Sequence, residues 1–150
     1  MDSLRIVRLS PSQSHCAIPS SLLLKPPQDL SIMSFTRSIL ITGGTSGLGY
    51  ACALHLARQH PKYLIVVASR ADPSSAAESI NKTLGQTNAM YLPLDLSNLT
   101  KVRSFATDWA TKNLAPIQVL LLNAGIQYTE NGFRKTDDGI ETTFGVNHVG

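Results

Sequence analysis

The sequence predicts an α/β fold in which a parallel β-sheet is covered by helices on both faces. Short apolar runs alternate along the chain with segments of helical periodicity. The apolar runs are continuous, which is typical of strands that are buried on both faces. The first run leads into a glycine-rich turn, TGGTSGLG at 42–49, that opens the first helix.

The first strand and the first helix are expected to flank this turn. Ser38–Thr42 (SILIT) is an apolar run ended by glycines, which indicates a buried strand. The pattern over Gly47–Gln59 is helical, and His60–Pro61 stops it. The residues that recur at helical spacing, and so are expected to form the buried side of this helix, are Leu48, Ala51, Cys52, Leu56 and Ala57.

Two further strands are expected on either side of a second helix. Tyr63–Ala68 (YLIVVA) is a continuous apolar run, and Ala89–Pro93 (AMYLP) is a weaker one. Between them, Ser74–Leu84 is expected to be helical, with Gly85 as its C-terminal stop.

The next helix is expected over Asn98–Lys112, with Ser97 as its N-cap. The fourth strand is expected at Ile117–Leu122 (IQVLLL), and a polar loop follows at Gln127–Lys135. The buried side of the helix is expected to carry Leu99, Val102, Phe105, Ala106 and Trp109.

A last helix is expected to begin at Thr136. Its inward-facing residues are expected to be Ile140, Phe144 and either Val146 or Val149. The order is therefore β-α-β-α-β-α-β-α, which requires right-handed crossovers at this spacing. The expected fold is a Rossmann-type doubly wound parallel sheet with three αβα layers, truncated after the fourth strand and the following helix.

The composition limits the function classes. The 150 residues have the size of one domain, with 43% hydrophobic residues and a net charge of +3. The basic residues are scattered, so no nucleic-acid partner is expected. The longest apolar run, LIVVA at 64–68, is too short to span a membrane. Cys16 and Cys52 lie far apart, so free thiols, no metal site and a cytoplasmic location are expected.

Residues 1–32 differ from the rest of the chain. They are rich in serine and proline and lack periodicity, so a disordered extension, or a start codon chosen upstream of Met33, is expected. A targeting signal is the alternative, because Arg5, Arg8 and Lys25 have few acidic residues near them. The folded domain is expected to cover residues 33–150.

The glycine-rich turn predicts a phosphate site. Gly43 is expected to turn the chain at positive φ, Gly47 to let backbone approach a ligand, and Gly49 to let the helix pack close to the sheet. Unpaired N–H groups at the helix start favour a phosphate, and Thr45 and Ser46 add hydroxyl donors. A P-loop is not expected, since no Lys-Ser/Thr pair follows the last glycine.

Four motifs, in order and in context, resemble those of the short-chain dehydrogenase/reductase family over residues 36–150. TGGTSGLG resembles its TGxxxGxG cofactor motif. Asp95–Leu96 resembles its adenine-pocket Asp, Asn123–Gly125 its NAG motif, and Asn147 the Asn of its active-site tetrad. Phrases such as VVASR and DGIETTFGVNHVG are most similar to the branch with retinol-dehydrogenase-like and protochlorophyllide-reductase-like enzymes.

The resemblance implies a dinucleotide cofactor and a catalytic role for Asn147 through a water-linked contact to a lysine. A core Asn with satisfied hydrogen bonds is the alternative for Asn147. Asp95 fits either an adenine contact or a cap of the following helix. With Arg70 added, the expected cofactor-binding residues are Gly43, Thr45, Ser46, Gly47, Leu48, Gly49, Arg70, Asp95, Leu96, Asn123, Ala124 and Gly125.

The end of the second strand favours NADP over NAD. NAD enzymes usually place a carboxylate there to bind the ribose 2′-hydroxyl, whereas this chain has Arg70. A guanidinium binds a 2′-phosphate through paired hydrogen bonds. Asp72 is the counter-argument, because its charge would partly neutralise the pocket.

The family's chemistry needs a Tyr-x-x-x-Lys pair, and none of the four tyrosines here has a lysine four residues later. We therefore expect an NADP-dependent oxidoreductase, acting on an unidentified small carbonyl or alcohol substrate, that is inactive as these 150 residues alone. A non-catalytic dinucleotide-binding module is the alternative. A Rossmann-like methyltransferase is disfavoured, because that fold would need a carboxylate at the position that Arg70 occupies.

The apolar fourth strand is expected to lack a partner on one edge, which predicts marginal stability and possible homo-oligomers.

Overall fold

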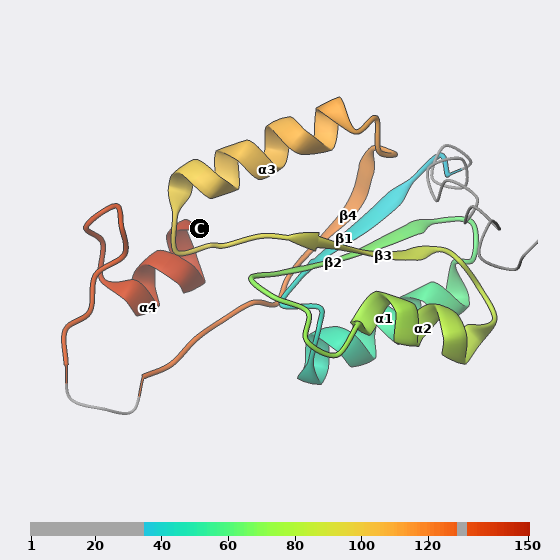
Figure 1. Cartoon of the computed structure of the whole chain (residues 1–150), viewed down its shortest axis with the longest axis horizontal. Coiled ribbons are helices and arrows are strands. Elements are labelled where there is room, and N and C mark those ends of the chain that lie inside the picture. The colour runs from blue at the N-terminus through green and yellow to red at the C-terminus, as the bar shows by residue number, and fades with distance from the viewer. Residues whose placement is uncertain (1–34, 129–131) are drawn as a thin grey trace, which may run out of the picture.

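The computed structural model describes residues 35–128 and 132–150. The extension expected at 1–32 and the candidate start Met33 lie outside these residues. The elements follow the predicted order (Figure 1). They are β1 (Ser38–Thr42), α1 (Gly47–Gln59), β2 (Leu64–Ser69), α2 (Ala76–Leu84), β3 (Ala89–Pro93), α3 (Leu99–Thr111), β4 (Ile117–Leu122), α4 (Thr142–Phe144) and the π-helical turn η3 (Gly145–Val149).

The four strands form one parallel sheet in the order β3-β2-β1-β4. Thr42, the last residue of β1, pairs with Ala68 of β2 and with Leu122 of β4. The carboxyl ends of these three strands therefore meet at one edge of the sheet. Figure 1 shows α1 and α2 on one face and α3 on the other, which confirms the three-layer Rossmann-type fold.

Each face of the sheet has its own apolar cluster, which explains why the strand sequences are continuously hydrophobic. Strand residues on one face pack against α1 and α2, and those on the other face lie under α3. The first cluster contains Ile39, Ile41, Ala53, Ala57, Ile65, Val67, Ala77, Ile80 and Ala89. The second contains Leu40, Leu64, Val66, Ala68, Leu92, Leu94 and Leu114.

The prediction of which residues of α1 face the sheet is wrong for most of them. Leu48 is 80% exposed, and Ala51 and Cys52 are exposed as well. The helix instead buries its small residues, Gly49, Ala53 and Ala57. Small side chains let the helix axis lie close to the sheet, so larger apolar residues stay at its flanks or in solvent. Of the expected residues, Ala57 is buried and Leu56 packs at the edge of the cluster.

The start of α3 also differs from the prediction. The N-cap is Asn98, whose side chain accepts a hydrogen bond from the Lys101 N–H at 2.9 Å. Ser97 points back to Asp95 instead. No residue of α3 is fully buried, since the helix covers its side of the sheet only with the half-buried Val102, Phe105 and Trp109. Of the other two expected residues, Leu99 is half-buried and Ala106 is exposed.

The last helix begins later than expected. Residues 136–139 form a turn around Gly139 at φ +79°, a conformation that interrupts helix propagation. Glu141 then caps α4 by accepting the N–H groups of Thr143 and Phe144 at 2.9 and 2.7 Å. Phe144, which was expected to face inward, is 55% exposed.

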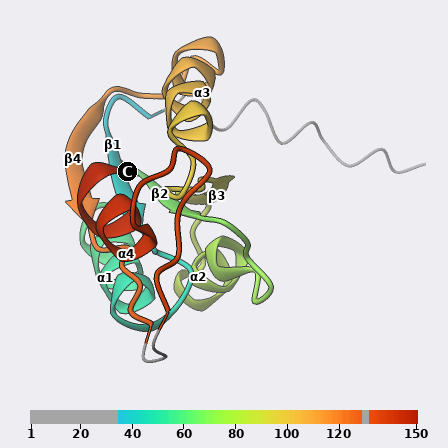
Figure 2. The same cartoon turned by 90° about the vertical axis from the view of Figure 1, so that its left-hand side faces the viewer.

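Two acidic residues of this turn attach it to the start of α3. Asp137 accepts a hydrogen bond from the Asn98 side chain, and Asp138 accepts one from the Leu99 N–H, each at 2.9 Å. Figure 1 shows α4 and the chain end to the left of the sheet, and Figure 2 looks onto them from that side. The segment from 132 to 150 is thereby held next to the carboxyl edge of the sheet.

Strand β4 is an edge strand within the residues that the structure describes. It pairs with β1 on one side. Its large apolar side chains are only partly covered, with Leu120 51% exposed and Leu122 75% exposed. The predicted open apolar edge is thus present.

Candidate functional site

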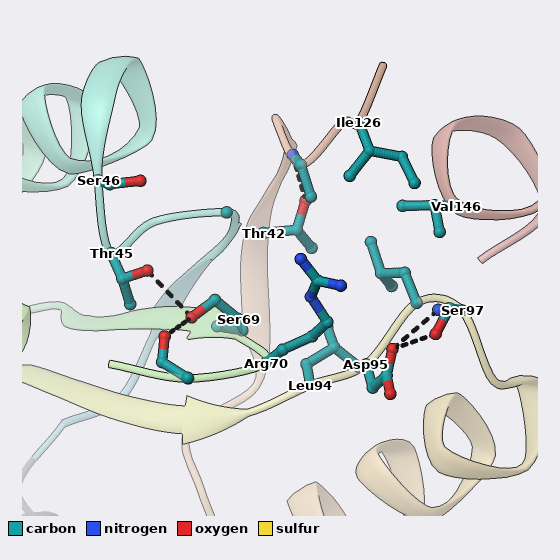
Figure 3. A pocket seen from close by; sticks show the side chains of 16 residues that line it. Thr42, Thr45, Ser46, Ser69, Arg70, Leu94, Asp95, Ser97, Ile126 and Val146 are labelled. Atoms are coloured by element: carbon teal, nitrogen blue, oxygen red, sulfur yellow. Dashed lines mark hydrogen bonds between the residues drawn. The ribbon is translucent and has the colours of Figure 1, made fainter. Parts of the chain in front are cut away.

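A pocket of about 320 Å³ lies at the carboxyl edge of the sheet (Figure 3). Five chain segments line it: the glycine-rich turn, the end of β2, the turn after β3, the segment after β4 and η3. The predicted residues that it brings together are Gly43, Thr45, Ser46, Arg70, Asp95, Leu96, Ala124 and Gly125. Gly47, Leu48, Gly49, Asn123 and Asn147 do not line it.

Close packing requires glycine at three positions of the turn, Gly43, Gly44 and Gly49. Gly43 has φ +64°, and a Cβ there would lie 2.9 Å from the Cα of Ala124. A Cβ on Gly49 would meet the Gly43 carbonyl oxygen and the Asn123 amide nitrogen. The expected roles of Gly43 in turning the chain and of Gly49 in close helix packing are therefore confirmed. Gly47 has φ +53° and open space around it, so its requirement is conformational.

The start of α1 offers backbone donors. Its N-cap Ser46 is extended, and its side chain makes no capping hydrogen bond. The N–H groups of the first turn have no partner within a helix, so they are available to an anion. Beside them, Thr45 Oγ1 donates to Ser69 Oγ at 3.0 Å, and Ser69 Oγ donates to the Ala71 carbonyl at 2.6 Å. A row of hydroxyls thus runs from the turn to the end of β2.

Asn123 fastens the segment after β4 to the end of β1. Its side-chain amide donates to the carbonyls of Thr42 and Gly43 at 3.1 and 3.3 Å. In return, Thr42 Oγ1 accepts the N–H groups of Asn123 and Ala124, each at 3.1 Å. The Asn123 side chain therefore serves the joint between β1 and β4, while Ala124 and Gly125 line the pocket.

Arg70 lines the pocket, and Figure 3 shows its guanidinium pointing into it. Within residues 35–128 and 132–150, the guanidinium has no hydrogen-bond or ion-pair partner. Asp72, the expected competitor, accepts the Ala76 N–H with both carboxylate oxygens at 2.9 and 2.8 Å, so it caps α2. Among the described residues, Asp72 therefore forms no ion pair with Arg70.

Asp95 is held by three donors. Its Oδ1 accepts the N–H and hydroxyl of Ser97 at 3.1 and 2.6 Å, and its Oδ2 pairs with Lys101 Nζ at 2.9 Å. Partial burial alone would raise the pKa of Asp95, but these hydrogen bonds outweigh it and lower the pKa below its ordinary value. Because Asn98 caps α3, Asp95 does not fill the capping role.

Asn147 closes the pocket indirectly. Its side-chain amide bonds to both the N–H and the carbonyl of Ile126, at 2.8 and 2.9 Å. The residue is exposed, yet its amide is satisfied. Ile126 and the neighbouring Val146 both line the pocket, so Asn147 holds one wall of it.

Sequence reasoning missed several lining residues, among them Thr42, Ser69, Leu94, Ile126 and Val146. The first four stand at or just after the carboxyl ends of strands, which is the available signal in a parallel sheet. The aromatic residues Tyr128 and Phe133 do not line this pocket. Their rings lie beside Arg134 and Lys135.

No helix in the described residues is long and apolar enough to cross a membrane. No group of three or more His, Cys, Asp or Glu side chains in them is arranged to hold a metal ion.

A protein-family model described as "short chain dehydrogenase" matches residues 37–150. Human polyprenol dehydrogenase (Homo sapiens) is 36% identical over 117 residues, which cover 76% of this chain and 34% of that protein. Retinol dehydrogenase 12 from Mus musculus is 33% identical over 114 residues, covering 76% and 35%. The chain thus spans about a third of the length of these curated relatives.

Solved structures with the same fold include a short-chain dehydrogenase from Sphingobium yanoikuyae in complex with NADPH. It matches with a TM-score of 0.58 and 25% identity, over 75% of this chain and 43% of that one. L-Sorbose reductase from Gluconobacter frateurii, complexed with NADPH and L-sorbose, matches with a TM-score of 0.60 over 79% and 44%. The latter is 21% identical and supports the fold alone.

Proposed function

The chain belongs to the short-chain dehydrogenase/reductase family, and from this premise we propose that its pocket binds NADP in preference to NAD. The observation that carries the proposal is the guanidinium of Arg70, which points into the pocket without a partner among the described residues. An acceptor with two negative charges, such as a ribose 2′-phosphate, satisfies it better than a hydroxyl does.

The rest of the pocket fits the other parts of a dinucleotide. The uncapped start of α1 suits the pyrophosphate, with Thr45 and Ser46 as additional donors. Asp95 and Leu96 stand where the adenine would lie, and Ala124 and Gly125 leave room for a ribose. The complex of the Sphingobium yanoikuyae enzyme with NADPH supports this choice of cofactor.

We further propose an oxidoreductase that acts on a small carbonyl or alcohol. Bound NADP accepts or supplies the hydride in such a reaction. The proton must come from an acid near neutral pKa, and no Tyr-x-x-x-Lys pair exists in these 150 residues. We therefore expect the chain alone to bind cofactor without turnover, and the water-linked role of Asn147 stays a prediction. The second candidate function is a dinucleotide-binding module without catalysis.

We propose residues 33–150 as the cofactor-binding domain, no nucleic-acid partner and a cytoplasmic location, although relatives include proteins from Brassica napus named as chloroplastic. The methyltransferase alternative is set aside by the family match.

The test is a fluorescence titration of the 150-residue chain with NADPH and with NADH. We expect NADPH to bind more tightly, and Arg70→Gln to remove most of the difference. A hydrogen bond to a charged group contributes about 1.5–3 kcal/mol, so the loss should be about tenfold or more. Arg103→Gln, which removes an exposed charge from α3, is the matched control. Equal binding of the two cofactors by the unmodified chain would overturn the NADP assignment, and measured turnover would overturn the inactivity.

A further inference from the structure

A second hollow of about 350 Å³ adjoins the cofactor pocket. Its lining includes Arg70, Leu94 and Asp95, which line the cofactor pocket as well, and it adds Lys101 of α3. The wall between the two hollows therefore carries a cation and an anion, Arg70 and Asp95. These two side chains do not form an ion pair in the described structure, which needs an explanation.

Asp95 forms no ion pair with Arg70 because both of its carboxylate oxygens already have other partners. Both donors of Ser97 point at Oδ1, and the ammonium of Lys101 lies 2.9 Å from Oδ2. Each carboxylate oxygen thus has a strong donor. Ser97 also fixes the orientation of the carboxylate, because its N–H and hydroxyl bind the same oxygen.

We propose that Lys101 is a positioning residue for cofactor selectivity: by occupying Asp95, it keeps the Arg70 guanidinium available for the 2′-phosphate. This inference rests on the proposed function and adds a residue that does not line the cofactor pocket. Without Lys101, the Oδ2 atom of Asp95 would have no cationic partner, and it lies in the same pocket wall as Arg70. Arginine binds carboxylates with two parallel hydrogen bonds, so Arg70 would turn from the pocket toward Asp95.

The effect of removing Lys101 on stability distinguishes this positioning role from a structural role. The Lys101 side chain is 60% exposed, and exposed ion pairs contribute little to the free energy of folding. Removing Lys101 should therefore leave the melting temperature nearly unchanged. Its effect should appear in the ratio of NADPH to NADH affinity, because only NADPH uses the Arg70 charge.

The decisive experiment compares Lys101→Met with the double variant Lys101→Met/Asp95→Asn in the full 150-residue chain. We expect Lys101→Met to reduce the NADPH preference at least fivefold. The double variant should recover most of it, since the neutral amide that replaces the Asp95 carboxylate still accepts the Ser97 hydrogen bonds but no longer attracts Arg70. Lys101→Arg should keep the preference. Arg103→Met removes an equal charge from the same helix and should change nothing, which controls for general electrostatics.

Each outcome is informative. If the unmodified chain binds NADPH and NADH equally, the proposed function fails and takes this inference with it. If the unmodified chain prefers NADPH and Lys101→Met keeps that preference, the inference alone is wrong. A loss that Asp95→Asn does not restore would mean that Lys101 acts on the cofactor directly, which also contradicts a role through Asp95.

Discussion

The side-chain amide of Asn147 forms a two-point hydrogen-bonded pair with the backbone of Ile126, at 2.8 Å to its N–H and 2.9 Å to its carbonyl. The pair joins the π-helical turn η3 to the segment after β4. Since Ile126 and Val146 both line the pocket, this contact connects the end of the described chain to the candidate site. π-Helical turns of this kind are frequent at functional sites.

Replacing Asn147 by Ala should loosen this wall. Two hydrogen bonds are lost, each with a net contribution of about 0.5–1.5 kcal/mol, so we expect NADPH affinity to fall about tenfold. The Ile126 amide should also exchange its hydrogen faster. The neighbouring exposed residue gives the control, His148→Ala, for which neither quantity should change. Unchanged exchange at Ile126 in Asn147→Ala would show that the pair is not maintained in solution.

The glycines of the turn should differ in the kind of damage that a methyl group causes. In Gly49→Ala the new Cβ would lie 2.5 Å from the Asn123 amide nitrogen, and such overpacking costs about 1–3 kcal/mol. It should also displace Asn123 and weaken cofactor binding. Urea unfolding and NADPH titration measure the two effects.

Gly47→Ala is the matched comparison, because its site is open but left-handed. The conformational cost is about 1–2 kcal/mol, without any clash. We expect its stability loss to be no larger than that of Gly49→Ala. If Gly47→Ala proves clearly more destabilising, the close approach of α1 to the sheet is not the main constraint on this turn.

The cap of α4 should make stability depend on pH in the acid range. Hydrogen bonds from the Phe144 and Thr143 N–H groups lower the pKa of Glu141 below its ordinary value of 4.5. The folded state then binds fewer protons than the unfolded state between the two pKa values, so stability rises with pH there. The contribution is complete above pH 4.5 and is lost as pH falls through the folded pKa.

Comparing unfolding free energies of the unmodified chain and Glu141→Gln from pH 7 to pH 3 tests this. The difference between them should shrink as the pH drops below 4.5, because a glutamine does not titrate. A difference that stays constant down to pH 3 would mean that the carboxylate is not ionised and bound at the cap.

Strand β4 should make the 150-residue chain self-associate. Its edge away from β1 is unpaired within the described residues, and its side chains Val119, Leu120 and Leu122 are exposed. The strand contains no charged residue or proline. Sedimentation velocity should show larger species as concentration rises, and Val119→Lys should suppress them. Leu48→Lys changes a more exposed apolar residue, on α1, and should not suppress them. Suppression by both variants would indicate a general effect of charge and not an interface at β4.

The strands were predictable from the sequence because continuous apolar runs and glycine stops are local signals. β1, β3 and β4 have the predicted bounds, and β2 is shifted by one residue. The phase of α1 was not predictable in this way, because the sheet selects the small Gly49 and Ala53 for close approach and leaves Leu48 in solvent. Size, and not hydrophobicity, decides which side of that helix faces inward.

The site was predicted in outline and missed in its connections. The motifs located the turn, Arg70 and the NAG segment at one edge of the sheet. Hydrogen bonds between segments about 80 residues apart, such as those of Asn123 with Thr42, leave no local signal in a single sequence. The interruption at Gly139 was equally hidden, since its neighbours have helical spacing. Whether Asp72 competes for Arg70 could be decided only from the position of the α2 N-terminus.

The hydrogen bonds between Thr42 and Asn123 form only when β1 pairs with β4, the two paired strands that lie farthest apart in the sequence. β1 leaves the ribosome early, and its partner β4 follows some eighty residues later, so the floor and one wall of the cavity cannot meet until that long loop closes. The candidate pocket is thus among the last parts of the domain to be completed during synthesis. Any ligand held there would favour the closed loop over the open one, so binding and the final stage of folding are one equilibrium.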